Sequence, residues 1–178
     1  MALISSERLL FRPLGANDVS ERYVAWLNDP EINRFLETRF ESQTIDSCLK
    51  FVLEQEQDAN SHLFGIFIKG SLEHIGNIKL GFVNQHHHTG QLSLLIGEKS
   101  YWRFGYATES VRRITEWGFD ELGLERIEAG CYDNNLGSLR TFIKVGYSVE
   151  GYFRSSVVSE GRRIGGFWLG MLRDDSRR

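Results

Sequence analysis

The sequence predicts a mixed α/β or α+β fold, a sheet with helices on its faces, from the order of its hydrophobic patterns. Three short apolar runs occupy the middle of the chain at 63–68, 75–82 and 91–96, each bounded by Gly, Asn or His. Such runs are typical of an antiparallel meander. From residue 105 onward the pattern becomes helix, strand, helix and hairpin, which places helices and strands around the same sheet.

The N-terminal part supplies a strand and two helices. Residues 9–14, Leu-Leu-Phe-Arg-Pro-Leu, are expected to form the first strand, and apolar residues recur at helical spacing over 18–27. Pro30 closes this region, because a proline excludes the residue before it from the α conformation. A second helix is expected to begin at Thr44 or Asp46, since either side chain can cap it.

The C-terminal part begins with the strongest helical pattern of the chain. Ala107, Val111 and Ile114 recur at steps of four and three, which predicts an amphipathic helix from Gly105 to about Gly123. The other expected elements are a strand at 125–132, a shorter helix that stops at Gly146, and two strands at 147–153 and 164–172.

Composition narrows the class of protein. The chain has 178 residues, 41% of them hydrophobic and 25% charged, which excludes a disordered or disulfide-scaffold polypeptide and suits one domain over residues 1–178. A net charge of −3 and a pI of about 6.0 argue against a nucleic-acid binder. With no long apolar window or signal peptide, and with Cys48 and Cys131 far apart, we expect a cytoplasmic protein without a membrane segment.

The stretch 96–109 holds the first candidate site, where a strand ends and the long helix begins. The first turn of a helix leaves backbone N–H groups unpaired and carries partial positive charge. Gly105 and Ala107 leave room for a pyrophosphate there, and Arg103 adds a cation. In the alternative interpretation, Gly105 is a turn residue and Arg103 a solvated charge. Neither a P-loop nor a dinucleotide fingerprint is present, so an ATPase or nicotinamide enzyme is not indicated.

The stretch 133–147 holds the second. Asn135 is a good N-cap for the helix that follows, Ser138 lies in the first turn, and Phe142 follows one turn later on the same face. Two interpretations stay open. Asn135 caps and Phe142 packs, or the amide and the hydroxyl converge beside a strand end and hold a ligand.

Together the two stretches resemble the GNAT superfamily of acyl-CoA-dependent N-acetyltransferases. Residues 102–107, Trp-Arg-Phe-Gly-Tyr-Ala, match the family pattern (Q/R)-x-x-G-x-(G/A) at all but the first position, where Trp102 stands. Asn135, Ser138 and the Lys144-Val-Gly-Tyr ending match its later N-x-x-S pattern. Residues 8–14, 26–36, 96–110 and 149–154 are similar to the RimJ/RimL-like branch in particular, so the resemblance covers nearly the whole chain.

The resemblance implies a mixed, mostly antiparallel twisted sheet of about seven strands, with helices on both faces and a splay between strands 4 and 5. It implies acetyl-CoA as the acyl donor, bound in that splay. By position, pantetheine would contact the backbone of Leu95, Ile96 and Gly97; the pyrophosphate would meet Arg103, Phe104, Gly105, Tyr106, Ala107 and Thr108; and Asn135, Ser138 and Phe142 would line the cofactor's other side.

The reaction implied is direct attack of a primary amine on the thioester, and it needs a neutral amine. A backbone N–H of Leu95 or Ile96 is the candidate for stabilising the oxyanion, with Ile96 preferred. Ser138 is the candidate acid for the departing thiolate, because Phe142 occupies the family's tyrosine position and cannot donate a proton. No general base stands out among Glu31, Glu37, Glu98, Glu128 and Asp133.

The resemblance implies that the acceptor binds opposite the pantetheine, under residues 28–40. Arg34 and Arg39 would hold the phosphates of a nucleotide-linked amino sugar, whereas Glu31, Glu37 and Glu41 would attract a polyamine or a protein N-terminus. A mixed-charge surface loop is the remaining interpretation, and a small amine is favoured slightly over a protein terminus.

Three further expectations concern function and partners. Phe142 also admits a different class of protein, a non-catalytic acyl-CoA-binding or sensing module. The triple histidine at 86–88 lacks the spacing of a metal site, so no metal is expected. The last hairpin, whose second strand is 164–172, is apolar on both faces. It is therefore expected to be buried in the sheet or shared with a second subunit, and a homodimer is expected.

Overall fold

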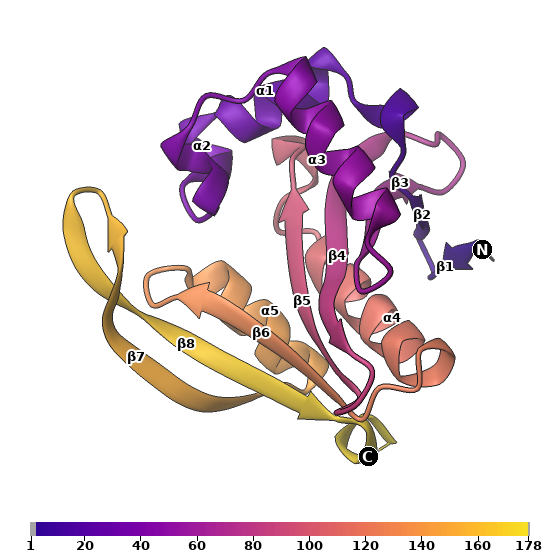
Figure 1. The fold of residues 1–178 in the computed structure, drawn as a ribbon, viewed down its shortest axis with the longest axis vertical. Helices are drawn as coiled ribbons and strands as arrows, with labels where there is room; N and C mark the ends of the chain where they lie inside the picture. The colour runs from indigo at the N-terminus through magenta and orange to yellow at the C-terminus, as the bar shows by residue number, and fades with distance from the viewer. Residues whose placement is uncertain (1–2, 178) are drawn as a thin grey trace.

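A computed structural model describes residues 3–177. They form one sheet with the strand order β1-β2-β3-β4-β5-β6-β8-β7, with helices packed against it (Figure 1). The parallel pair is β5 with β6, and the other neighbouring pairs are antiparallel. The strands are β1 (Ile4–Ser5), β2 (Leu9–Pro13), β3 (His62–Ile68), β4 (His74–Asn84), β5 (Thr89–Ile96), β6 (Arg126–Tyr132), β7 (Ser148–Ser159) and β8 (Arg162–Leu172).

Helices cover both faces of the sheet. They are α1 (Glu21–Asn28), α2 (Pro30–Asn33), α3 (Ile45–Gln57), α4 (Tyr106–Glu121) and α5 (Leu136–Val145). One hydrophobic cluster joins α4 and α5 to the sheet through Val111, Ile114 and Phe142. A second joins α1 and α3 to the opposite face through Trp26 and Val52. The mixed α/β fold with helices on both faces is therefore confirmed (Figure 1).

The ends of the helices follow local signals in the sequence. Thr44 caps α3 by accepting a hydrogen bond from the Ser47 N–H at 3.1 Å, which resolves the choice between Thr44 and Asp46. Asp29 is extended, with ψ 117°, and Pro30 not only ends α1 but opens the short helix α2. Beyond the predicted elements, the structure adds β1 and α2 and extends β7 to Ser159.

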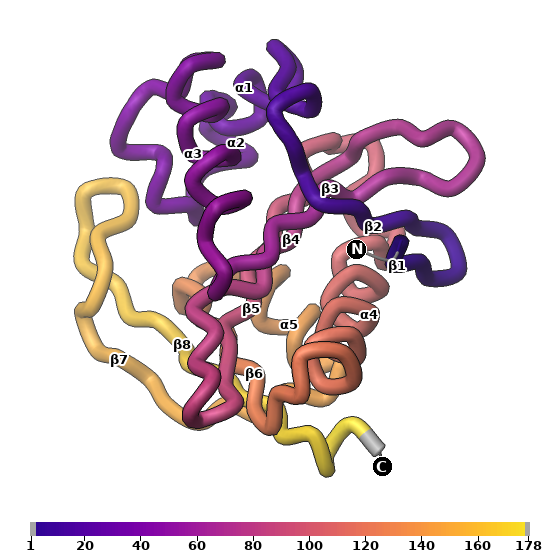
Figure 2. The backbone as a smooth tube through the Cα atoms, turned by 45° about the vertical axis from the view of Figure 1, so that its right-hand side comes forward, coloured from indigo at the N-terminus to yellow at the C-terminus, as the bar shows by residue number. Residues whose placement is uncertain are grey.

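The splay was predicted between the fourth and fifth expected strands, at 91–96 and 125–132. Because the structure adds β1 at the start of the chain, these strands are β5 and β6, and the splay separates them. The two strands pair only through Thr89–Arg126, Gly90–Ile127 and Gln91–Glu128. Beyond those pairs β5 stays hydrogen-bonded to β4 while β6 continues along β8, so their carboxyl ends diverge, as Figure 1 shows. The β7–β8 hairpin curves round until its tip lies beside the segment after α2 (Figures 1 and 2).

Candidate active site

The N-terminus of α4 presents unpaired backbone donors. Gly105 is the N-cap with φ 85°, a left-handed conformation that glycine adopts without steric cost, and it carries no side chain to occupy the helix end. The first intrahelical bond runs from the Glu109 N–H to the Gly105 carbonyl at 3.0 Å. The N–H groups of Tyr106, Ala107 and Thr108 precede it, so they are available to an anion.

Arg8 adds a cation at this helix end, and the sequence reasoning missed it. Its guanidinium donates to Glu109 Oε2 at 2.7 Å and to the Phe104 carbonyl at 3.0 Å. Its Cζ atom lies 4.2 Å from the centre of the Tyr106 ring. Burial opposes the charge of Glu109, but hydrogen bonds from the Arg8 backbone and from Ser6 hold the pKa of this carboxyl below its usual value. The ion pair offsets a carboxylate that would otherwise repel an anion.

A cavity of about 520 Å³ adjoins the same helix end. Gly105 and Thr108 belong to its wall, together with three basic residues, Arg112, Arg113 and Lys144. Three carboxylates also line it, so its charge is mixed, and its wall includes both the start of α4 and the three cations. This combination suits phosphate groups.

The carboxyl end of β5 turns the backbone of Ile96 toward the splay. The Gly97 N–H donates to the Ile75 carbonyl of β4 at 2.8 Å. Because N–H groups alternate sides along a strand, Gly97 and Leu95 face β4 and Ile96 faces away from it. The Ile96 carbonyl agrees with this direction, since it accepts a hydrogen bond from the Trp102 indole at 2.8 Å. The geometry thus favours Ile96 over Leu95 as the oxyanion donor.

The strand end is held by packing against α1. Gly97 is buried, and a Cβ there would lie 2.1 Å from the Trp26 ring, so only glycine fits. Trp26 Nε1 also donates to Glu98 Oε1 at 3.0 Å. These contacts fix the backbone beside the candidate oxyanion donor.

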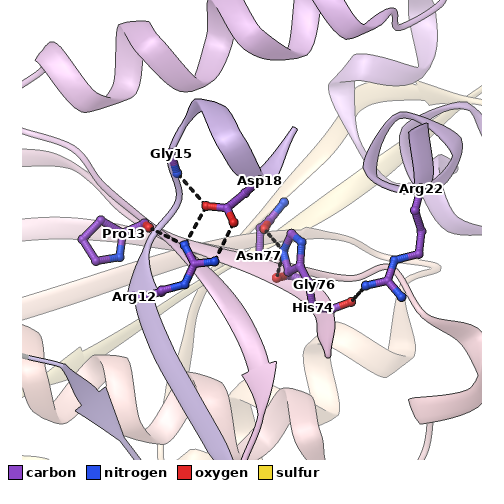
Figure 3. Close-up of polar contacts among 8 residues, drawn as sticks. All are labelled: Arg12, Pro13, Gly15, Asp18, Arg22, His74, Gly76 and Asn77. Atoms are coloured by element: carbon purple, nitrogen blue, oxygen red, sulfur yellow. Dashed lines mark hydrogen bonds and ion pairs between the residues drawn. The ribbon is translucent and has the colours of Figure 1, made fainter. Parts of the chain in front are cut away.

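A buried polar group anchors the start of β4 behind this strand end (Figure 3). His74 Nε2 lies 2.8 Å from Asn77 Oδ1 and 2.9 Å from the Gly76 carbonyl, and burial lowers the pKa of this histidine. Arg22 of α1 donates to the His74 carbonyl at 2.7 Å. Beside them, Arg12 holds Asp18 through two bonds of 2.7 and 2.6 Å. Helix α1 is thereby attached to β4, and the turn before it, which holds Asp18, is attached to β2.

Helix α5 brings Asn135 and Ser138 together as a cap. Asn135 Oδ1 accepts a hydrogen bond from the Ser138 N–H at 3.1 Å, and the Ser138 side chain is half-buried. Phe142 is 2% exposed, and its ring packs edge-on against Tyr147 at 5.0 Å. Phe142 therefore fills the core and offers almost no surface to a ligand, so the expectation that it lines the cofactor finds no support in its burial.

A second cavity, of about 720 Å³, lies under the segment after α1. It brings together all three predicted acceptor residues, Glu31, Arg34 and Arg39. Ser159, the last residue of β7, and Glu160, in the turn before β8, complete the wall. Sequence reasoning missed this turn because no local pattern links it to residues more than a hundred positions earlier.

Arg39 is committed to holding the protein together. Its guanidinium donates to the Leu36 carbonyl at 2.6 Å, to the Tyr132 hydroxyl at 2.8 Å and to the Val158 carbonyl at 2.7 Å. The Tyr132 hydroxyl in turn donates to the Glu37 carboxylate. The 3₁₀ helix Glu37–Phe40 is thereby joined to the ends of β6 and β7, and the exposed Arg34 is left as the guanidinium free to meet an acceptor.

The five candidate bases differ in which groups donate hydrogen bonds to their carboxylates. Glu31 accepts from Lys99, Glu98 from Trp26, Glu128 from Arg126, and Asp133 from Tyr152 and the Gly165 N–H. Glu37 alone among these five accepts from a side chain at the carboxyl end of β6, where the splay is widest.

Known proteins match both the sequence and this fold. The family model for the acetyltransferase (GNAT) domain matches residues 8–148. The N-acetyltransferase p20 of Bacillus licheniformis is 26% identical over 97% of each chain. The probable N-acetyltransferase YjcK of Bacillus subtilis is 31% identical, over 93% of this chain and 92% of its own. Spermidine N-acetyltransferase of Vibrio cholerae, solved with CoA and spermine, superposes with a TM-score of 0.86 at 18% identity, over 96% of this chain and 99% of its own. The chain belongs to the GNAT family of acetyltransferases.

Proposed function

We propose that the protein is an acetyl-CoA-dependent N-acetyltransferase of the RimJ/RimL-like branch, acting as one domain on a small primary amine. One observation carries the proposal: the unpaired N–H groups at the start of α4 lie beside a splay into which the Ile96 backbone is turned. An anion site and an oxyanion donor are thus joined by the turn at 97–105.

The residues divide the work of binding the donor. The N–H groups of Tyr106, Ala107 and Thr108, with Arg8 and the basic wall of the adjoining cavity, would hold the phosphates of coenzyme A. The backbone of β5 would pair with the pantetheine arm along the splay. Asn135 and Ser138 would border its other side, whereas Phe142 supports them from the core.

The chemistry follows from these positions. The acceptor amine attacks the thioester carbonyl, and the Ile96 N–H stabilises the oxyanion that forms. Collapse of the tetrahedral intermediate breaks the carbon–sulfur bond and releases the thiolate, which Ser138 would protonate. A thiol with a pKa near 8.5 gives a tolerable leaving group, so this proton transfer speeds the reaction but is not indispensable to it.

The acceptor cavity favours a small amine. Its wall carries the carboxylates of Glu31, Glu41 and Glu160 and the exposed guanidinium of Arg34. Carboxylates attract a cationic amine such as a polyamine, and the spermine in the Vibrio cholerae structure is consistent with that class. Arg34 suits the phosphate of an amino sugar.

A thiol-release assay separates these acceptors. Acetyl-CoA is supplied with spermidine, glucosamine 6-phosphate or a peptide with a free serine N-terminus, and acetyl-CoA binding is titrated by calorimetry. Turnover of spermidine or the sugar phosphate supports the proposal, and turnover of the peptide alone moves the assignment to a protein acceptor. Acetyl-CoA binding with no turnover on any amine would identify a sensing module, the second candidate, for which Phe142 at the family's tyrosine position is the specific observation.

We also propose a cytoplasmic homodimer. The edge strand β7 exposes Val149, Tyr152 and Phe153 by 47, 49 and 53% of their surfaces, so it carries apolar surface that a second copy would cover. Cys48 and Cys131 are both free, as in a reducing compartment. Light scattering of the purified protein tests the dimer.

Within residues 3–177, no helix combines the length and the apolar character needed to cross a bilayer.

A further inference from the structure

Tyr132, the last residue of β6, lies across the splay from the end of β5. Tyr132 and Leu95 each stand four residues beyond the last paired residues of their strands, Glu128 and Gln91. At about 3.3 Å per residue, both lie about 13 Å along the splay, on either side of it. Tyr132 is therefore level with the strand end that carries the candidate oxyanion donor.

The side chain of Tyr132 faces the acceptor side of the sheet. Ile127, Ala129 and Cys131 belong to the cluster under α4 and α5, so the alternate residue Tyr132 points to the opposite face. Its ring there packs edge-on against Phe35 at 6.2 Å. Arg39, which lines the acceptor cavity, donates to its hydroxyl at 2.8 Å. One side chain thus connects the cavity wall to this hydroxyl.

The hydroxyl is arranged for proton transfer. It accepts from Arg39 and donates to Glu37, so one oxygen lone pair remains for an amine N–H. Glu37 and Arg39 are the charged groups that face it, both from the 3₁₀ helix 37–40, and Asp133, next along the chain, bonds to Tyr152 and Gly165 instead. The Glu37 side chain is 74% exposed, so a proton received there can pass to water.

We infer that Tyr132 and Glu37 form the proton-accepting pair for the acceptor amine. The ammonium gives a proton to the Tyr132 oxygen while the Tyr132 hydroxyl proton passes to the Glu37 carboxylate, which leaves a neutral amine, a neutral tyrosine and a protonated Glu37. Glu37 then releases the proton to water. Arg39 holds the hydroxyl in place and is a positioning residue.

The inference rests on the proposed acetyltransferase function, and the test separates the two. The variant Glu37→Gln keeps an oxygen that accepts from Tyr132 but cannot take up a proton. We expect its kcat/KM for spermidine or glucosamine 6-phosphate to fall about 100-fold at pH 7, with acetyl-CoA affinity unchanged. The deficit should shrink as the pH rises toward 10, because the free amine then forms without help. Tyr132→Phe should show the same pH-dependent deficit.

Tyr152→Phe is the matched control. It removes a tyrosine–carboxylate bond of the same kind, to Asp133 at 2.8 Å, on the opposite face of the sheet, and it should retain wild-type kinetics. A Glu37→Gln enzyme within twofold of wild type from pH 6 to 10, or a loss of rate equal at every pH, overturns the inference while leaving the acetyltransferase intact. A wild-type protein that neither binds acetyl-CoA nor acetylates any of the amines overturns both.

Discussion

The indole of Trp102 donates a hydrogen bond of 2.8 Å to the backbone carbonyl of Ile96. The family pattern has Gln or Arg at this position. Because Trp102 stands there instead, the sequence alone did not indicate what this side chain does. In the structure the indole binds the protein's own backbone. It fixes the end of β5 beside the splay, and in the proposed binding mode the helix N–H groups and Arg8 would face the phosphates instead.

Replacing Trp102 should therefore loosen the strand end. In Trp102→Phe the Ile96 carbonyl loses its partner, and we expect a loss of about 1 kcal/mol in the free energy of unfolding. The KM for acetyl-CoA should rise as well, because the pantetheine-facing backbone is less well held. Urea unfolding and steady-state kinetics measure both. Trp117→Phe, on the core-facing side of α4, should lower stability without changing this KM. An unchanged KM in Trp102→Phe would separate the indole from cofactor binding.

Gly105 should be needed for binding and not only for the turn. Its φ is 85°, and that of Gly123, after the far end of α4, is 65°. Alanine at either position costs roughly 1 kcal/mol of stability, because a Cβ is unfavourable in the left-handed region. Only Gly105→Ala also places a methyl group beside the N–H groups that are proposed to bind phosphate. Calorimetry should therefore show weaker acetyl-CoA binding for Gly105→Ala and wild-type binding for Gly123→Ala. Equal affinities in the two variants would refute the helix N-terminus as the phosphate site.

Ser138 should contribute to kcat if it protonates the leaving thiolate. We expect Ser138→Ala to lower kcat by at least about 10-fold, because no other hydroxyl of α5 replaces it. Thr141→Ala is the control, since the Thr141 hydroxyl donates to the Gly137 carbonyl at 2.9 Å on an exposed part of the same helix. Initial rates across pH 6–10 measure the difference. A Ser138→Ala enzyme with full kcat and the wild-type pH profile shows that the thiolate leaves unassisted.

Burial of His74 predicts a loss of stability at acid pH. Burial keeps the pKa of His74 below its ordinary value, so the unfolded chain takes up a proton near pH 6.5 that the folded chain still refuses. The unfolded state then binds more protons, and the free energy of unfolding falls as the pH drops below about 6.5. His62 acts in the same direction, since its pKa is also lowered by burial.

Urea unfolding between pH 5 and 8 measures this slope. His74→Gln retains a side-chain donor for Asn77 and cannot titrate, so it should flatten part of the slope. The exposed His87→Gln should leave the slope as in wild type. If the slope survives in His74→Gln, other groups account for the acid sensitivity.

Local signals in the sequence were enough for most of the helices and strands and for the start of α4. Periodicity and capping act between residues a few positions apart, so the patterns around Gly105, Asn135 and Gly146 predicted where helices begin and end. The resemblance to the GNAT family, and not periodicity, implied the splay between neighbouring strands and pointed to the segment that holds Glu31, Arg34 and Arg39, which the structure places around one cavity.

The contacts that complete the site were beyond such patterns. Arg8 meets Glu109 across 101 positions, and Arg39 meets Tyr132 across 93 and Val158 across 119. Nothing in the local sequence indicates these partners, because hydrogen bonds between distant polar side chains produce no periodic pattern in the sequence. Phe142 shows the same limit of local patterns. Its spacing in the sequence was compatible with both core packing and ligand contact, and only the packing of α5 against the sheet places it in the core. Helix starts depend on neighbours in the chain, whereas the acceptor cavity and its proton-accepting pair depend on which distant segments the sheet brings side by side.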